Sequence, residues 1–428
     1  MPLPARLDAL RDLDALRDRN VRLLLIGQGL SFLGDQMTPV AVSFAILDRG
    51  GSARQVGWVL GAGTASMVVF LLLGGVLADR LARRWLMIGA DLLRFAAQGT
   101  AAGLLVAGHW RIWELVIAEA AWGAGAAAFQ PAMTGLLPEL VTGERLAQAN
   151  ALYGLVGSAG FVIGPSLAGA LLAAAGSGTA VAVDAGTFLV SVATLAGLRL
   201  PAAAARVEGT GMLRELRDGW HAFWSRPWLS AVVGQYSLWH FAVLAPTIVL
   251  GAVVAKQDLG GAAAWGAILS SLGAGSVVGG IVALRWRPSR PLVASSLVVL
   301  PFAGVPALLA AVAPVWTIAV CAAMGGAGFA VFGALWTTTM QREVPSELLS
   351  RVSAYDWLGS EALLPVGYAA AGPVAAVVGT RTTLIGSAVA MFVLTAAVLA
   401  VPAVRRMGAG GAAGGAAVGA AEPASEPA

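Results

Sequence analysis

Predominantly apolar segments, each about as long as a bilayer is thick, recur along the whole of this chain. Apolar residue types make up 58% of the 428 residues and charged types only 12%, whereas roughly a quarter of a soluble domain is charged. So few charges cannot cover a water-facing surface, and the mean hydropathy is +0.79. A closed β-barrel would show short alternating segments instead. The sequence therefore predicts an all-α polytopic membrane protein.

We expect twelve membrane-spanning helices, because that number of apolar segments reaches the length needed to cross a bilayer. They cover approximately 21–47, 56–78, 85–107, 112–135, 149–174, 179–199, 228–254, 263–284, 291–311, 315–338, 352–377 and 380–402. An even number of crossings places both termini on the same side of the membrane.

Positively charged residues identify that side. Of the 27 lysines and arginines, 21 fall in the termini and in the connections that share their side, five fall in the opposite connections, and Arg94 lies inside a span. Connections rich in arginine and lysine stay in the cytoplasm. The asymmetry therefore predicts a multi-pass protein of the cytoplasmic (inner) membrane with both termini in the cytoplasm.

The longest connection divides the spans into two groups of six that look like copies. The segment VTGERLAQANA (141–151) aligns with VPSELLSRVSA (344–354) at an offset of 203 residues. Two parallel six-helix repeats suit alternating access. We therefore expect an amphipathic N-terminal segment (1–20), a first six-helix bundle (21–200), a cytoplasmic linker with an interfacial helix (201–227), a second six-helix bundle (228–403) and a disordered tail (404–428).

The composition argues against several kinds of site. Cys321 is the single cysteine and the three histidines are scattered, so we expect no disulfide and no metal site. The sequence contains no phosphate-binding loop, so we expect neither a cofactor nor ATP hydrolysis. These features indicate a transporter rather than an enzyme. We expect it to act as a monomer in the lipid bilayer, without a nucleic-acid partner.

A dense charge cluster separates the second and third spans. The stretch GVLADRLARR (75–84) resembles the loop motif of the major facilitator superfamily, G-x-x-x-D-[RK]-x-G-[RK]-[RK]. The matching residues are Gly75, Asp79, Arg80, Arg83 and Arg84, and alanine stands at position 82 where the family has glycine. The resemblance implies the twelve-helix fold of that superfamily.

The fifth span carries a second resemblance. The stretch GFVIGPSLAG (160–169) is similar to the G-x-x-x-G-P-x-x-x-G motif of the antiporter branch, through Gly160, Gly164, Pro165 and Gly169. The whole chain looks most like twelve-helix drug and siderophore exporters of the macrolide-efflux and enterobactin-exporter type. This implies efflux of a small lipophilic compound, drug-like or siderophore-like, by proton antiport. The alternative is a facilitator or importer of a small polar solute with the same fold.

We interpret the charged loop as a gating latch between the two halves. Gly75 permits close approach of another helix, and Asp79 suits the positive N-terminal end of a neighbouring helix. The proposed latch also includes Arg80, Arg83, Arg84, Asp91 and Arg94. Alternatively, the loop arginines only fix the topology, and Asp91 and Arg94 form an ordinary pair one turn apart.

The small residues of the fifth-span motif allow close helix packing, and we expect the eighth span, SSLGAGSVVGG (270–280), to be the partner. This contact could seal the seam between the halves against proton leak. It could equally be the generic packing of small residues that is common in membranes.

Carboxyl groups inside the hydrocarbon are costly, so each is a candidate for function. Asp35, Glu119 and Glu361 lie well inside predicted spans, and we expect them to carry the coupling proton. Glu119 stands where the antiporter branch often has an arginine. Three further acids, Glu114, Asp184 and Asp356, are interpreted as interfacial groups in contact with water.

The transport cavity should be apolar and aromatic with a few polar groups. Its candidate residues are Gln36, Gln130, Gln235, Tyr236, Trp239, His240, Trp336 and Tyr368. Each of them alone is equally well explained by packing. As a set they favour a lipophilic cargo, neutral or cationic, over sugars, phosphates or carboxylates.

The predicted topology can be tested with reporters fused after Met407. A fluorescent protein that matures only in the cytoplasm should fluoresce there, and alkaline phosphatase, which is active only outside, should be inactive, because the arginine asymmetry holds the C-terminus inside. The opposite pair of results would contradict the predicted orientation.

Overall fold

The computed structural model describes residues 14–141, 144–199 and 220–408, and these ranges are helical without a β-strand. The first group of helices is α2 (Asp14–Arg17), α3 (Arg19–Asp35), α4 (Thr38–Asp48), α5 (Ala53–Arg80), α6 (Arg83–Ala107), α7 (Ile112–Leu140), α8 (Glu144–Ala175) and α9 (Ser177–Ala196). The second is α11 (Pro227–Trp239), the π-helical turn η1 (His240–Leu244), α12 (Ala245–Asp258), α13 (Ala262–Arg285), α14 (Pro291–Val298), the 3₁₀ turn η2 (Leu300–Ala303), α15 (Gly304–Ala310), α16 (Val315–Glu343), α17 (Ser346–Glu361), α18 (Leu364–Val378), α19 (Thr380–Ala400) and α20 (Pro402–Arg406).

Ten of the predicted spans are helices, or consecutive helices, that are long and apolar enough to cross a membrane. The other two predicted spans correspond to α5 and α6, which have 28 and 25 residues. Both exceed the roughly 20 residues that a bilayer requires, and Asp91, Arg94 and Gln98 make α6 more polar. The all-α membrane fold is confirmed, and crossing by α5 and α6 stays a prediction.

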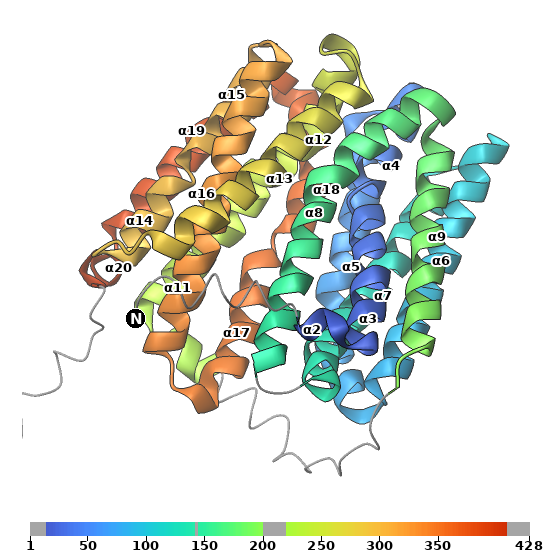
Figure 1. Ribbon diagram of the computed structural model, residues 1–428. Coiled ribbons are helices and arrows are strands. Elements are labelled where there is room, and N and C mark those ends of the chain that lie inside the picture. The colour runs from blue at the N-terminus through green and yellow to red at the C-terminus, as the bar shows by residue number, and fades with distance from the viewer. Residues whose placement is uncertain (1–13, 142–143, 200–219, 409–428) are drawn as a thin grey trace, which may run out of the picture.

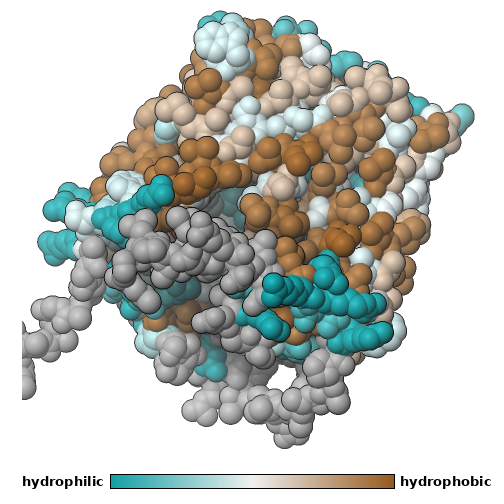
Figure 2. All heavy atoms as spheres, in the orientation of Figure 1, coloured by the Kyte–Doolittle hydropathy of each residue, from teal (hydrophilic) through white to brown (hydrophobic). Residues whose placement is uncertain are grey.

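The surface agrees with this assignment. We call the end of the bundle where α3 begins and α20 finishes the terminal end, and the opposite end the distal end. Large apolar side chains are exposed between them, including Val69 at 66%, Val106 at 70% and Val377 at 86%. Figure 2 shows a broad apolar band on one face of the molecule, with hydrophilic residues gathered at its margins. Such an extent of exposed apolar surface is typical of contact with lipid.

The helices form two groups that lie side by side (Figure 1). Within the first, α6 packs against α7 and α9, and α3 packs against α8 and α9; within the second, α16 packs against α13 and α14. The predicted boundaries at 200 and 228 stay predictions. The predictions for residues 1–13, 201–219 and 409–428 concern segments outside the described residues.

The seam between the two groups is made by helix pairs with small residues. Helix α8 packs on α13, and α5 packs on α18. A Cβ atom at Gly57 would lie 2.1 Å from the carbonyl oxygen of Tyr368, and one at Gly266 would lie 2.3 Å from that of Pro165. Lys256 also forms an ion pair with Asp48 across the seam. These contacts all lie in the distal half, so the described conformation is closed at the distal end.

Two spans are broken where this seam begins. Pro39 lies four residues after Asp35, and Pro365 lies four residues after Glu361. Proline cannot donate the backbone hydrogen bond that would continue the helix to the residue four positions earlier. Helix α3 accordingly ends at Asp35 and α17 ends at Glu361. The segments beyond the breaks, α4 and α18, are the ones that approach the other half.

The tight seam predicts a specific cost for added volume. Replacing Gly266 with Ala should destabilise the described conformation by about 1–3 kcal/mol, because the new methyl group meets backbone that cannot move alone. Gly280→Ala on the same helix is the matched control, since no atom lies within 4 Å of its Cβ position. Thermal unfolding of the purified variants compares them, and equal melting temperatures would contradict the close packing at Gly266.

Candidate functional site

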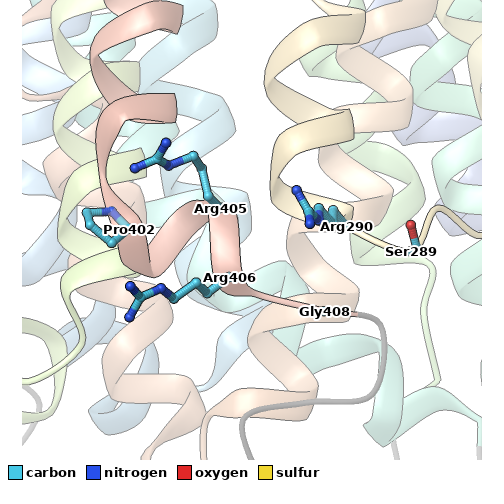
Figure 3. A pocket seen from close by; sticks show the side chains of 6 residues that line it. All are labelled: Ser289, Arg290, Pro402, Arg405, Arg406 and Gly408. Atoms are coloured by element: carbon cyan, nitrogen blue, oxygen red, sulfur yellow. The ribbon is translucent and has the colours of Figure 1, made fainter.

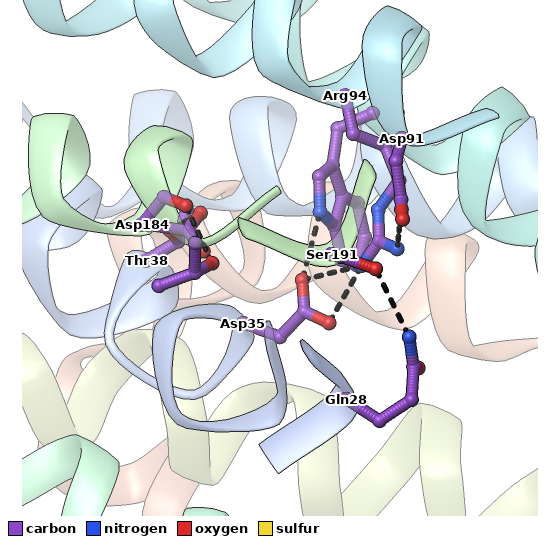
Figure 4. A network of polar contacts seen from close by, with 9 residues as sticks. Gln28, Asp35, Thr38, Asp91, Arg94, Asp184 and Ser191 are labelled. Carbon is purple, nitrogen blue, oxygen red and sulfur yellow. Dashed lines mark hydrogen bonds and ion pairs between the residues drawn. The ribbon is translucent and has the colours of Figure 1, made fainter. Parts of the chain in front are cut away.

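An arginine and two aspartates form the centre of a polar network inside the first group of helices (Figure 4). The Arg94 guanidinium on α6 donates to both carboxylate oxygens of Asp35 on α3, at 2.8 and 2.6 Å. It also donates to Asp91 Oδ1 at 3.0 Å, one turn earlier on α6. Asp91 is 0% exposed and Arg94 is 4% exposed. We call Asp35, Asp91 and Arg94 the charged triad.

The helix break explains why Asp35 needs a cation. As the last residue of α3, its carboxylate stands at the negative end of the helix dipole, which disfavours negative charge. The Arg94 guanidinium offsets this through Nη2, which donates charge-assisted hydrogen bonds to both carboxylate oxygens. Trp122 on α7 also donates from Nε1 to Asp35 Oδ1 at 3.1 Å. The carboxylate therefore connects three helices at the break.

Aromatic rings enclose the arginine. Its guanidinium carbon lies 4.1 Å from the ring centre of Phe188 and 5.4 Å from that of Phe129. The Trp122 ring centre lies 5.9 Å away. Ring faces attract a cation while excluding water. The charge of Arg94 is thus balanced by carboxylates and aromatic faces.

Two further buried carboxyl groups lie in the same half, and each is held by a neutral side chain. Gln98 Nε2 donates to Glu119 Oε1 at 3.1 Å, and the Thr38 hydroxyl donates to Asp184 Oδ2 at 2.6 Å. Glu119 is 6% exposed and Asp184 is 0% exposed. In hydrocarbon, a carboxyl group without a cation is far more stable neutral than charged. Both groups are therefore able to hold a proton.

The interpretation of Asp184 as a water-contacting acid is wrong, because α9 turns its side chain inward toward Thr38 at the start of α4. Asp356 is only partly buried and accepts a hydrogen bond from Trp336 Nε1 at 3.0 Å. Glu114 accepts from the backbone N–H of Arg111 at 2.7 Å and so stabilises the first turn of α7.

The sequence reasoning also missed the pairing of Asp35 with Arg94. A usable signal was their equal depth: Asp35 lies near the middle of Arg19–Asp48 and Arg94 near the middle of α6. Two opposite charges at the same level of a membrane are expected to meet. Arg94 also supplies an arginine to this region from the third span, although Glu119 occupies the fourth-span position where one was expected.

The residues of the predicted latch do not form one cluster in the described part of the structure. Asp91 and Arg94 belong to the charged triad rather than to the loop. Arg83 donates to the carbonyl oxygen of Gly135 at 2.8 Å and pairs with Glu139 at 2.6 Å, and Arg84 donates to the carbonyl oxygens of Ala196 and Leu198. The side chains of the other latch candidates, Gly75, Asp79 and Arg80, lie outside the described residues. The latch itself stays a prediction.

The fifth-span motif faces two directions. A Cβ atom at Gly169 would lie 2.8 Å from the carbonyl oxygen of Ala262 on α13, which confirms contact with the eighth span. The Ser166 hydroxyl also bonds to Ser270 at 2.7 Å. Gly160 and Gly164 instead pack against α3, where added Cβ atoms would meet residues 32–36. For these two glycines the predicted partner is wrong, because they lie one turn apart on one face of α8, whereas Gly169 lies five residues further on and faces a different side.

The second half contains a smaller pair at its own break. Glu361 Oε1 lies 3.8 Å from His240 Nε2, and His240 Nδ1 lies 2.8 Å from the carbonyl oxygen of Ser360. His240 opens the π-helical turn η1, which packs against α18. Each half thus has a carboxyl group at a proline break, and this group faces an arginine or a histidine side chain from a neighbouring helix.

Aromatic side chains gather beside this pair. Tyr236 stacks on Phe332 with ring centres 4.9 Å apart, and Trp239 contacts Phe329 at 5.0 Å. Of the cavity candidates, Gln235, Tyr236 and Trp239 line one small cavity together with Ser296, Val299, Phe329, Phe332 and Met391. The remaining candidates are separate: His240 and Trp336 adjoin the ring cluster, Gln36 lies at the α3 break, Gln130 is exposed on α7, and Tyr368 lies at the seam.

Comparison with known proteins places these features in a family. The family model described as Major Facilitator Superfamily matches residues 24–359. The multidrug efflux pump Tap of Mycolicibacterium fortuitum is 27% identical over 90% of this chain and 96% of the relative. Macrolide efflux protein A of Streptococcus pyogenes is 23% identical over 80% of this chain and 85% of the relative.

Solved structures show the same fold. The nucleoside transporter NupG has 15% sequence identity and a TM-score of 0.71 over 89% of this chain and 98% of that chain. A bacterial homologue of the human lysosomal transporter Spinster, in an inward-facing and unoccupied conformation, has 16% identity and a TM-score of 0.67 over 90% and 96% of the two chains.

The triad predicts non-additive effects on stability. Arg94→Gln leaves two buried carboxylates without their cation and should cost about 3–5 kcal/mol. Asp35→Asn should cost less, because Asp91 still neutralises Arg94. In the double variant, the loss should be smaller than the sum of the two single losses. Reversible unfolding in bicelles measures all three, and strict additivity would contradict the direct contact.

Proposed function

Because this chain belongs to the major facilitator superfamily, we propose that it exports a small lipophilic compound by proton antiport with alternating access. It is a multi-pass membrane transporter and not an enzyme. The proposal adds the direction, the coupling ion and the cargo class. It also places both termini in the cytoplasm of a bacterial cell, so that the terminal end is the cytoplasmic one.

The observation that carries the proposal is the charge balance of the triad. One guanidinium faces two carboxylates at mid-membrane depth. If both aspartates are ionised, the triad has a net charge of −1, and binding one proton makes it neutral. Arg94 keeps a partner in either condition, which avoids the large cost of an unpaired buried charge. The triad can therefore accept and release a proton without collapsing.

The position of Asp35 links that proton to the conformation. Asp35 ends α3, and Asp48 at the far end of α4 pairs with Lys256 of the other half. When Asp35 is ionised, Arg94 holds the break in the shape that directs α4 toward the seam. A proton on Asp35 weakens this contact and so lowers the stability of the distal-closed conformation relative to its alternatives.

The aromatic cluster of the second half supports a lipophilic cargo. Tyr236, Trp239, Phe329 and Phe332 offer ring faces and edges, while Gln235 and Ser296 are the polar groups of the cavity they line. Planar apolar compounds and organic cations pack favourably against such rings. Glu361 lies beside the cluster through His240 and could balance a cationic cargo. The names of the two relatives, a multidrug efflux pump and a macrolide efflux protein, also support a drug-like cargo.

Transport into everted membrane vesicles tests the coupling. With an acidic interior imposed, the parent should accumulate ethidium, whereas Asp35→Asn should accumulate at least about tenfold less because it has lost the group that binds the proton. Exchange of preloaded ethidium without a gradient should continue in the variant, since the aromatic cluster is intact. Asp258→Asn, an exposed carboxyl at the distal end, is the matched control and should behave like the parent.

Glu119→Gln and Glu361→Gln extend the same assay. Glu119→Gln should reduce accumulation. Glu361→Gln should have a smaller effect on coupling and a larger effect on cargo affinity.

Full gradient-driven accumulation by Asp35→Asn would refute the role of the triad. Gradient-independent equilibration of a polar solute such as a nucleoside, with no ethidium transport by the parent, would favour the facilitator alternative.

A further inference from the structure

Arginine side chains line a depression at the terminal end of the second half, away from the charged triad and the aromatic cluster. It has a volume of about 800 Å³ and is lined by Ser289, Arg290, Pro402, Arg405, Arg406 and Gly408. Arg405 and Arg406 lie on α20, and Ser289 and Arg290 directly precede α14 (Figure 3). Gly408 closes one side, with its Cβ position 3.9 Å from the carbonyl oxygen of Ser289.

The positive charge of this depression is not balanced within the described residues. The ion pairs between described side chains involve Arg83, Arg94, His240 and Lys256, and none includes an arginine of the depression. Arg405 donates a long hydrogen bond of 3.5 Å to the carbonyl oxygen of Ala400, which uses one of its five donors. Gathered like charges repel, so a bound anion would stabilise the arrangement.

The start of α14 adds to the attraction for an anion. Arg290 is the N-cap of this helix and Pro291 is its first residue. The first backbone N–H groups of a helix lack intrahelical partners, and the dipole makes this end positive. Guanidinium groups bind phosphate through paired hydrogen bonds. The donors of the depression therefore match the oxygens of a phosphate group.

The surroundings indicate a lipid phosphate rather than a soluble one. Trp286, in the same loop as Arg290, is 38% exposed, and tryptophan is enriched at the level of lipid headgroups. Leu297 on α14 is 46% exposed and Val393 on α19 is 59% exposed, which provides apolar surface farther into the membrane. In Figure 2 the hydrophilic patch at the α20 end borders the apolar band directly.

We propose that the depression formed by Arg290, Arg405 and Arg406 binds the phosphate of an anionic phospholipid from the leaflet at the terminal end. The guanidinium groups hold the headgroup, and the acyl chains lie along α14 and α19. Because Pro402 joins α20 to the end of α19, the bound lipid would also hold this junction in place.

Native mass spectrometry of the full-length purified protein, titrated with phosphatidylglycerol, tests the site. The parent should retain one phosphatidylglycerol in preference to phosphatidylcholine. A basic residue at a membrane surface contributes about fivefold in affinity, so R290Q/R405Q/R406Q should bind that lipid more than tenfold more weakly. R19Q/R22Q/R145Q removes the same charge from exposed positions in the first half, at the same end of the bundle, and should bind like the parent.

Three outcomes would overturn the proposal. The first is equal loss of phosphatidylglycerol in the two triple variants, which would indicate general surface charge. The second is equal retention of phosphatidylcholine by the parent. The third is displacement of the lipid by millimolar inorganic phosphate, which would indicate a site for a soluble anion. If the triple variant does not fold, Arg405→Gln and Arg406→Gln are measured singly, and each should show about a fivefold loss.

Discussion

A buried carboxylate needs a cation, and the first half of this transporter is built around one such pair. Asp35 ends a helix at a proline break and is held by Arg94, which Asp91 also neutralises. The break directs α4 to the seam, where Asp48 meets Lys256. We therefore propose that a change in the charge balance at this contact also changes the direction of the helix.

The second half repeats the arrangement with different residues. Glu361 precedes Pro365 by four positions, as Asp35 precedes Pro39, and the segment beyond it, α18, forms the seam with α5. Its partner is a histidine at 3.8 Å rather than an arginine that donates to both carboxylate oxygens. The 3.8 Å separation is longer than a hydrogen bond, so this pair holds its break less firmly. In the proposed function, the first break therefore serves coupling, and the second lies beside the aromatic cluster proposed to bind cargo.

The general architecture could be predicted from the sequence, because bilayer length, arginine asymmetry and glycine motifs act locally along the chain. The all-α membrane fold and the packing of the fifth span on the eighth followed from these patterns. The side-chain contacts between different helices could not be predicted from these patterns. Asp184 looked interfacial by its distance from the span end, and only the rotation of α9 turns it to Thr38. Arg94 was assigned to the nearby loop, because sequence distance to Arg83 is visible whereas its contact with Asp35 spans 59 residues.

The most direct test is a distance measurement across the distal seam. Spin labels are attached to cysteines introduced at His109 and Gln257, which are both exposed, in a Cys321→Ser background. Double electron–electron resonance then measures the distance between the two halves. In the parent the short distance of the distal-closed conformation should dominate. Asp35→Asn, which mimics the protonated acid, should shift much of the population to longer distances, whereas Asp258→Asn should not. An unchanged distance distribution in Asp35→Asn would contradict the account, because the charge of Asp35 would then have no effect on closure of the distal end.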